Sequence, residues 1–100
     1  MKLRLITLNG KRAVFDVEKA TCLLSDRWTA GRESTRWTTL WLTKSGRYVE
    51  EYTTLWQGES SSICEIEKGQ ALQIMTDALP EHLTKQGMEL LDKLVPPEEI

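Results

Sequence analysis

Residues 38–52, TTLWLTKSGRYVEEY, predict a β-hairpin at the centre of this 100-residue chain. β-Branched and aromatic residues lead up to a short polar segment and resume after it, as in two paired strands. The polar segment spans residues 44–47, and Gly46 within it can adopt the positive φ that a short hairpin loop with a bulge requires. We therefore expect a central hairpin over about residues 37–52.

A second hairpin is expected at the beginning of the chain. Residues 2–8 and 11–17 flank Asn9-Gly10, a pair that favours a two-residue loop because both residues tolerate positive φ. Such a loop would place Leu5 opposite Val14 in the strand pair. The two faces would then hold Leu3, Leu5 and Val14 on one side and Ile6, Ala13 and Phe15 on the other. Neither face is polar, so we expect one side to be buried and the other partly covered.

The segments that follow alternate between short strands and loops. Residues 20–24 form an apolar run too short for a helix and predict a strand. Residues 25–36 are polar and rich in Arg, Ser, Thr and Gly, which favours a loop, and residues 53–62 predict another loop. Residues 62–66 alternate between polar and apolar side chains and predict the last strand.

Helical spacing begins near Lys68, where apolar residues recur on one face as far as about Leu79, before Pro80 ends the helix. Apolar residues from Leu83 to Leu94 trace a second helix, with Thr84 as a candidate cap. We therefore expect an α+β fold in a single domain of residues 1–100. Its antiparallel sheet of four to five strands, a meander of hairpins, would be covered on one face by two C-terminal helices. In an alternative arrangement, the last helix packs against a second copy.

Composition narrows the class of protein. The chain is 40% hydrophobic and 28% charged, which is ordinary for a soluble globular protein, and no apolar run approaches the ~18 residues of a membrane span. Its first residues lead into a strand pattern rather than a signal peptide, so we expect a cytoplasmic protein. Cys22 and Cys64 are expected to be reduced, half-buried strand residues, although a pair across neighbouring strands stays open.

Charge is distributed unevenly along the chain. Residues 1–48 contain ten Lys or Arg and four acidic residues, whereas residues 49–100 contain three Lys and eleven acidic residues. The two halves could pair across the sheet or head to tail between copies.

Residues suited to catalysis are sparse. His82 is the only histidine, and we expect it to lie alone on the surface. Glu65 and Glu67 share a strand face, which a solvated strand edge explains without catalysis. The sequence shows neither the Cys/His spacing of a zinc site nor a glycine-rich phosphate loop. We therefore predict a protein that is not an enzyme and has no metal or cofactor.

Arginine and tryptophan recur together between residues 27 and 41. This mixture suits a protein interface, where both residue types are favoured anchors, and it also suits stacking on nucleic-acid bases. In a third interpretation the tryptophans are core residues and the arginines solvate a loop. The net charge of −2 disfavours nucleic acid, so we expect a protein partner or self-association, with single-stranded nucleic acid as the alternative. The candidate binding residues are Arg27, Trp28, Arg32, Arg36, Trp37 and Trp41.

Residues 39–49 read TLWLTKSGRYV, close to the pattern T-L-Y-x-T-x-x-G-x-Y-F-L. In this segment the chain resembles a family of small, uncharacterised bacterial proteins from Gram-positive genomes, phages and conjugative or plasmid elements. Residues 19–24 and 69–72 extend the likeness over roughly residues 13–79, although residues 53–58 replace the glycine-rich loop of other members. The resemblance implies a small accessory protein of a mobile element and transfers no site residue.

Overall fold

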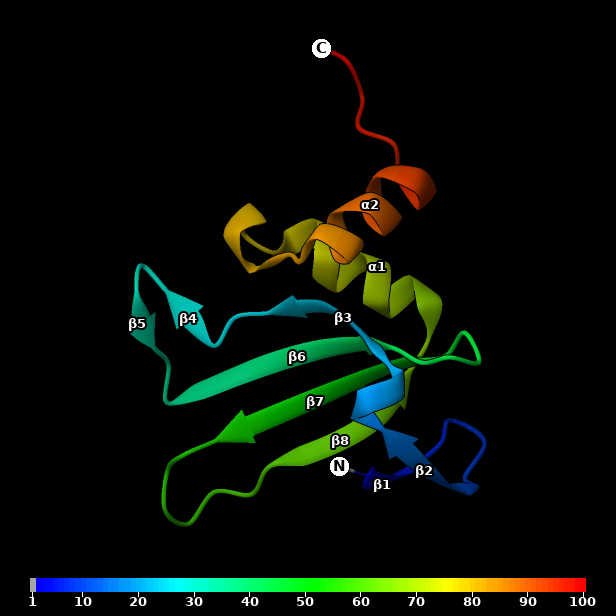
Figure 1. Ribbon diagram of the computed structural model, residues 1–100, viewed down its shortest axis with the longest axis vertical. Helices are drawn as coiled ribbons and strands as arrows, with labels where there is room; N and C mark the ends of the chain where they lie inside the picture. Colours follow the sequence, from blue (N-terminus) through cyan, green and yellow to red (C-terminus); the bar gives the residue numbers. More distant parts are fainter. Residues whose placement is uncertain (1) are drawn as a thin grey trace.

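A computed structural model describes residues 2–100, and its elements follow the order β-β-β-β-β-β-β-β-α-α, with two short 3₁₀ turns (Figure 1). The strands are β1 (Lys2–Ile6), β2 (Arg12–Asp16), β3 (Thr21–Ser25), β4 (Trp28–Thr29), β5 (Arg32–Glu33), β6 (Arg36–Leu42), β7 (Tyr48–Thr54) and β8 (Ser62–Ile66). The helical elements are η1 (Val17–Lys19), α1 (Lys68–Asp77), η2 (Pro80–His82) and α2 (Lys85–Leu94). The predicted α+β class is confirmed.

The main sheet has the order β2-β1-β8-β7-β6-β3 among the residues that the structure describes. It therefore has six strands rather than the four to five expected. All neighbouring pairs are antiparallel except β1 and β8, which run parallel with Ile6 opposite Cys64. The β1–β2 hairpin thus extends the sheet at β8, with β1 next to β8 and β2 at the edge.

The two edge strands of this sheet, β2 and β3, are consecutive in the chain. In a flat sheet the edges would lie about 24 Å apart, since neighbouring strands are separated by about 4.8 Å. The chain from Asp16 to Thr21 could span about 17 Å even if fully extended, and η1 shortens it further. The sheet must therefore curl, with β2 brought round toward β3.

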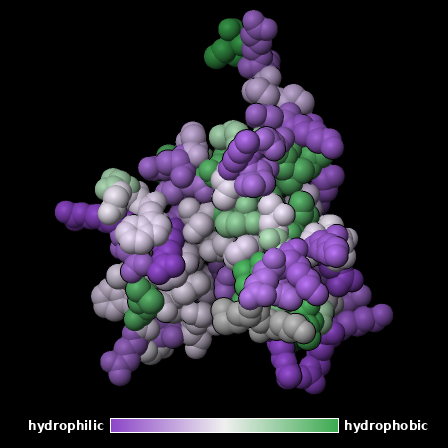
Figure 2. Space-filling view, in the orientation of Figure 1, coloured by the Kyte–Doolittle hydropathy of each residue, from purple (hydrophilic) through white to green (hydrophobic). Residues whose placement is uncertain are grey.

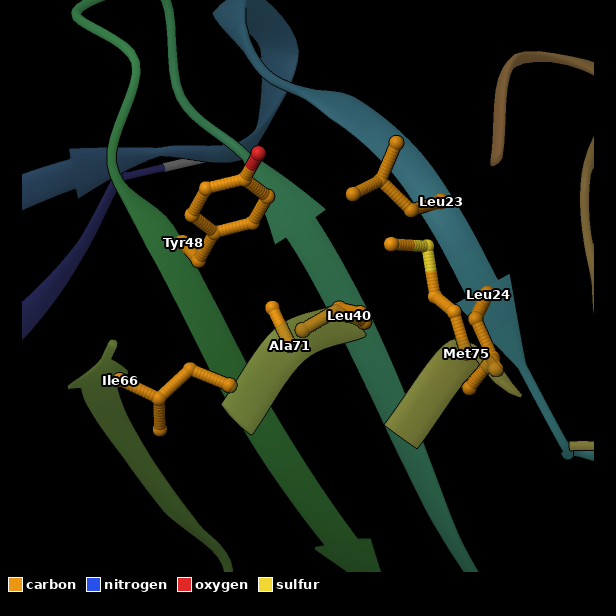
Figure 3. Packing of buried hydrophobic residues seen from close by; sticks show 7 residues of the cluster. All are labelled: Leu23, Leu24, Leu40, Tyr48, Ile66, Ala71 and Met75. Atoms are coloured by element: carbon orange, nitrogen blue, oxygen red, sulfur yellow. The ribbon is translucent and has the colours of Figure 1, made fainter. Parts of the chain in front are cut away.

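Curling gives the sheet two separate cores. On the concave face, Leu5, Phe15 and Val49 are buried, and half-buried Trp41 packs against them. On the opposite, convex face lie the two helices, as the sequence predicted (Figure 1). Figure 3 shows the side chains that meet beneath α1, where Ala71 and Met75 point toward the strands. The buried residues of this convex core are Leu23, Leu24, Leu40, Tyr48, Ile66, Ala71 and Met75.

The register expected for the first hairpin is wrong by one residue. Leu5 pairs with Ala13, and Ile6 pairs with Arg12. Of the loop residues, Gly10 has positive φ and Asn9 does not, and the Thr7 N–H donates to the Lys11 carbonyl at 2.8 Å. This is a three-residue loop with a bulge instead of a two-residue loop, and it moves Ala13 and Phe15 onto the face of Leu3 and Leu5.

The central hairpin forms as predicted. Gly46 has φ of +86° at the turn, and the Thr43 N–H donates to the Arg47 carbonyl at 2.8 Å. Residues 25–36, expected to be a loop, contain the small β4–β5 hairpin. Ala30 and Gly31 form its two-residue turn with φ of +52° and +79°, so the turn type expected at residues 9–10 occurs here instead.

The helix α2 docks directly on β3, which has a bulge at Leu23. The bulge lets the consecutive residues Leu23 and Leu24 both face the helices. Thr84 caps α2 as predicted, because its Oγ1 accepts from the Gly87 N–H at 3.0 Å. The same hydroxyl donates to the Cys22 carbonyl at 2.6 Å, which ties the helix start to the strand.

The two cysteines do not lie on neighbouring strands. Cys22 lies on β3 and Cys64 on β8, with β6 and β7 between them, so no pair forms. Cys22 is half-buried as expected, whereas Cys64 is exposed. Burial raises the pKa of both thiols. None of the helices among the described residues has the length and apolar character needed to cross a membrane.

Candidate functional site

The β4–β5 hairpin carries the first group of predicted site residues. The Arg27 guanidinium lies 4.7 Å from the ring centroid of Trp37 and 6.0 Å from that of Trp28. Its Nε and Nη2 atoms also contact the Glu33 carboxylate at 2.9 and 2.8 Å. We call these four residues the Trp28 cluster. Its arginine therefore has a carboxylate partner on the same hairpin and lies near two indole rings.

Arg36 belongs to a second group. Its guanidinium makes a two-pronged contact with Glu59, with Nε–Oε1 at 2.9 Å and Nη2–Oε2 at 2.6 Å, and lies 5.4 Å from the ring centroid of Trp56. Thr35 holds that indole, since its Oγ1 accepts from the Trp56 Nε1–H at 2.8 Å. Hydrogen bonds from Arg36 and Thr54 lower the pKa of Glu59 to about 2, so the pair is ionised at neutral pH. We call Arg36, Trp56 and Glu59 the Trp56 cluster.

The two clusters point to different sides of the sheet. Arg36 and Trp37 are neighbours on β6, and side chains alternate between faces along a strand. The structure therefore brings Arg27, Trp28 and Trp37 together but separates them from Arg36. Both clusters nevertheless lie at the same end of the β6–β7 hairpin, where Leu55 donates its N–H to the Thr35 carbonyl at 2.8 Å (Figure 1).

Two predicted site residues are largely inside the protein. Trp37 is only 9% exposed, so it packs under Arg27 and offers almost no surface to a partner. Trp41 lies on the face away from the helices, but the β1–β2 hairpin covers that face. Its ring centroid is 5.9 Å from that of Phe15, and its Nε1–H donates to Glu51 Oε1 at 3.2 Å. Trp41 is therefore part of the concave core.

Two tryptophans remain open to solvent. Trp28 is 57% exposed and Trp56 is 53% exposed, and Leu55 beside Trp56 is exposed as well. Arg32, also exposed, makes no ion pair with any residue that the structure describes. Figure 2 shows this end, on the left, as a mixture of hydrophilic and hydrophobic groups rather than one hydrophobic area. Such a mixture is typical of protein surfaces that bind partners reversibly.

Three members of these clusters were not predicted from the sequence: Glu33, Glu59 and Trp56. Trp56 and Glu59 lie in a loop some twenty residues from Arg36, and only strand pairing brings the two segments together. The signal available in the sequence was the apolar pair Leu55-Trp56 within an otherwise polar loop.

The remaining candidates for chemistry are dispersed. His82 is half-buried and does not lie alone, since its Nε2 is 3.1 Å from Thr29 Oγ1, a contact that links η2 to β4. Glu65 is not at a solvated strand edge, since its side chain is 12% exposed, and its Oε2 lies 3.6 Å from Arg47 Nε. Glu67 lies at the start of α1, outside the strand. No group of three or more His, Cys, Asp or Glu suited to a metal ion occurs within residues 2–100.

Comparison of the chain with protein-family models, with curated proteins and with solved structures gave no match.

Proposed function

We propose that this chain is a non-enzymatic protein-binding module whose contact residues are the exposed Trp28 and Trp56. The observation that carries the proposal is that each indole lies against an arginine whose charge a glutamate already neutralises. The bound arginine and glutamate hold the ring at the surface, in an orientation that a partner can meet without ordering it first. Rigid tryptophans of this kind are the residues that contribute most to protein interfaces.

Single-stranded nucleic acid is the second candidate, because an exposed indole beside arginine can stack on a base. Two features favour a protein instead. A phosphate at Arg27 or Arg36 would have to share the guanidinium with Glu33 or Glu59, whose negative charge repels it. Arg32 is then the one arginine of this end without an ion pair to a described residue. The net charge of −2 also opposes association with a polyanion.

The partner is either a second copy or another protein. The uneven charge of the two halves of the chain supports contact between copies, and the exposed indoles suit either case. The likeness of the central hairpin to proteins of phages and plasmids extends the proposal to an accessory protein of a mobile element, whose partner would be encoded by the element or by its host.

The test compares the intact chain with Trp28→Ala and Trp56→Ala, using Lys85→Ala as the control on α2. Light scattering over a range of concentrations measures self-association, and quantitative affinity enrichment from the source cells measures other partners. Loss of a buried tryptophan contact weakens an interface by about 2 kcal/mol or more, which is about 30-fold in affinity. A partner that is retained equally by all three variants would contradict the proposal.

A second measurement separates the two candidate functions. A fluorescent oligothymidylate is titrated with the chain at about 50 and 200 mM salt, and binding is followed by anisotropy. A protein-binding module gives no saturable binding at either salt concentration. Saturable binding that weakens steeply with salt and disappears in Arg32→Ala would establish the nucleic-acid alternative.

A further inference from the structure

A pocket of about 230 Å³ opens at the other end of the central hairpin, away from both tryptophan clusters. The β1–β2 hairpin, η1 and the β6–β7 turn form its walls, and it enters the concave side of the curled sheet. The turn lies beyond Leu42, whereas the Trp56 cluster begins at Arg36. The six residue steps from Arg36 to Leu42, at about 3.3 Å each, separate the two sites by about 20 Å along the strand.

The floor of the pocket is apolar and is part of the concave core. It consists of Leu5, Phe15 and Val49, all at most 9% exposed, together with half-buried Ala13. Its volume exceeds the ~150 Å³ of a cavity known to accept benzene. A single aromatic ring with one small substituent therefore fits.

The rim of the pocket is charged, with three cations and two carboxylates. Lys19 from η1 and Lys44 from the turn are exposed and make no ion pair with a described residue. Arg47 reaches Glu65 only at 3.6 Å, so this guanidinium retains donors for another acceptor. Asp16, the other carboxylate, accepts from the Glu18 N–H at 3.1 Å. The rim therefore has an excess of positive charge, with its cations less fully paired than its acids.

The turn that carries two of the cations is firmly held. Thr43 Oγ1 accepts from the Arg47 N–H at 2.9 Å and lies 3.1 Å from Ser45 Oγ, and the Gly46 N–H donates to the Thr43 carbonyl at 3.0 Å. These bonds fix the backbone from which Lys44 and Arg47 extend. A ligand would therefore order side chains but not the loop, which lowers the entropic cost of binding.

We propose that this pocket binds a small aromatic carboxylate, with the ring on the floor formed by Leu5, Phe15 and Val49 and the carboxylate between Lys19, Lys44 and Arg47. Pockets of this type, apolar with a few convergent charged groups, occur at the mouths of curled sheets. The proposal is independent of the protein-binding function, because the two sites share no residue.

The test is a titration of the ¹⁵N-labelled chain with benzoate up to about 20 mM at low salt, since a ligand of this size binds with Kd on the order of 1 mM. We expect shifts in the amide signals of residues 43–47 and in the indole signal of Trp41, which packs on Phe15. The indole signals of Trp28 and Trp56 stay in place. Absence of shifts at residues 43–47 and Trp41 would overturn the proposal.

Two control ligands separate the contribution of the carboxylate to affinity from that of the ring. Benzamide has nearly the same shape without the charge, and acetate has the charge without the ring, so each is expected to bind at least about threefold more weakly than benzoate. Benzamide binding as well as benzoate would overturn the assignment of the cations.

Two variants at exposed lysines leave the core unchanged, and a third variant alters the floor of the pocket. Lys44→Glu is expected to weaken benzoate binding about fivefold, whereas Lys85→Glu on α2 leaves it unchanged. Ala13→Leu fills the floor and should abolish binding, and the spectrum itself reports whether this variant is folded. Equal affinity of the two Lys→Glu variants, or of the folded Ala13→Leu variant and the original chain, counts against the pocket.

Discussion

Gly87 of α2 lies so close to Leu23 of β3 that a Cβ atom at position 87 would be 1.9 Å from the Leu23 carbonyl oxygen. The bulge at Leu23 turns this part of the strand toward the helix, and Thr84 donates its backbone N–H to the Leu23 carbonyl at 3.1 Å. The first turn of α2 therefore rests on the backbone of an edge strand, with no side chain between them. This contact attaches α2 to the sheet.

Gly87→Ala should destabilise the protein by at least about 2 kcal/mol, because neither the strand backbone nor the helix can move far enough to admit a methyl group. Chemical denaturation followed by tryptophan fluorescence measures the loss. Gly69→Ala is the matched control on α1, since nothing lies within 4 Å of its added Cβ, and its stability should change by less than about 1 kcal/mol. Equal stabilities of the two variants would contradict the close contact.

Thr84→Val removes a hydroxyl and keeps the shape of the side chain. It should cost about 1–2 kcal/mol, because the Gly87 N–H loses its cap and the Cys22 carbonyl loses its donor. Thr76→Val is the control, since that exposed hydroxyl bonds only within α1, to the Leu72 carbonyl, and its loss should change stability by less than about 0.5 kcal/mol. The same denaturation assay measures both.

Ala30→Gly should stabilise the protein by about 0.5–1 kcal/mol. Ala30 has φ of +52°, where a Cβ is unfavourable, and glycine adopts this conformation without that cost. Ala78→Gly is a control of opposite sign, because residue 78 has φ of −75°, so glycine there increases the entropy of the unfolded chain and removes a methyl group that packs on the convex core. A less stable Ala30→Gly variant would show that the β4–β5 turn does not form.

The Arg36–Glu59 pair predicts a specific response to pH. Because the pKa of Glu59 is lowered from 4.5 to about 2, the pair's stabilising effect is complete above pH 4.5 and disappears as the pH falls toward 2. Titration of the Glu59 carboxyl ¹³C signal should have its midpoint near 2, and Arg36→Met should raise that midpoint. Arg32→Met, which removes an exposed arginine that makes no ion pair with a described residue, should leave the midpoint where it is; equal midpoints in both variants would count against the pair.

Local patterns in the sequence predicted much of the architecture. The residues from Leu40 to Val49 specify a hairpin, because β-branched and aromatic residues on both sides favour strands and Gly46 favours a turn between them. Pro80 limits the first helix and Thr84 caps the second, for reasons confined to a few neighbouring residues. The largely antiparallel sheet, the two helices on one of its faces and the cap of α2 were predictable for this reason.

The register of the first hairpin could not be predicted from its local sequence alone. Asn9-Gly10 fits two loop types, and the choice between them moves Phe15 from one face of the sheet to the other. Burial of Phe15 against Trp41 and Val49 stabilises the longer loop, and those residues lie far along the chain. The energy that decides the register therefore comes from contacts that the local pattern does not contain.

By itself, the sequence determined where the strands of the main sheet and the two helices lie, since those preferences depend on neighbouring residues, but it did not indicate the β4–β5 hairpin. The tertiary structure decided which tryptophans are available to a partner. A strand exposes or buries a side chain according to what covers its face, so the curl of the sheet enclosed Trp41, and the pairing of β6 with β7 brought Trp56 to Arg36. The tertiary structure also placed the charges of η1 and the β6–β7 turn around one pocket, because those segments come together only when the sheet curls.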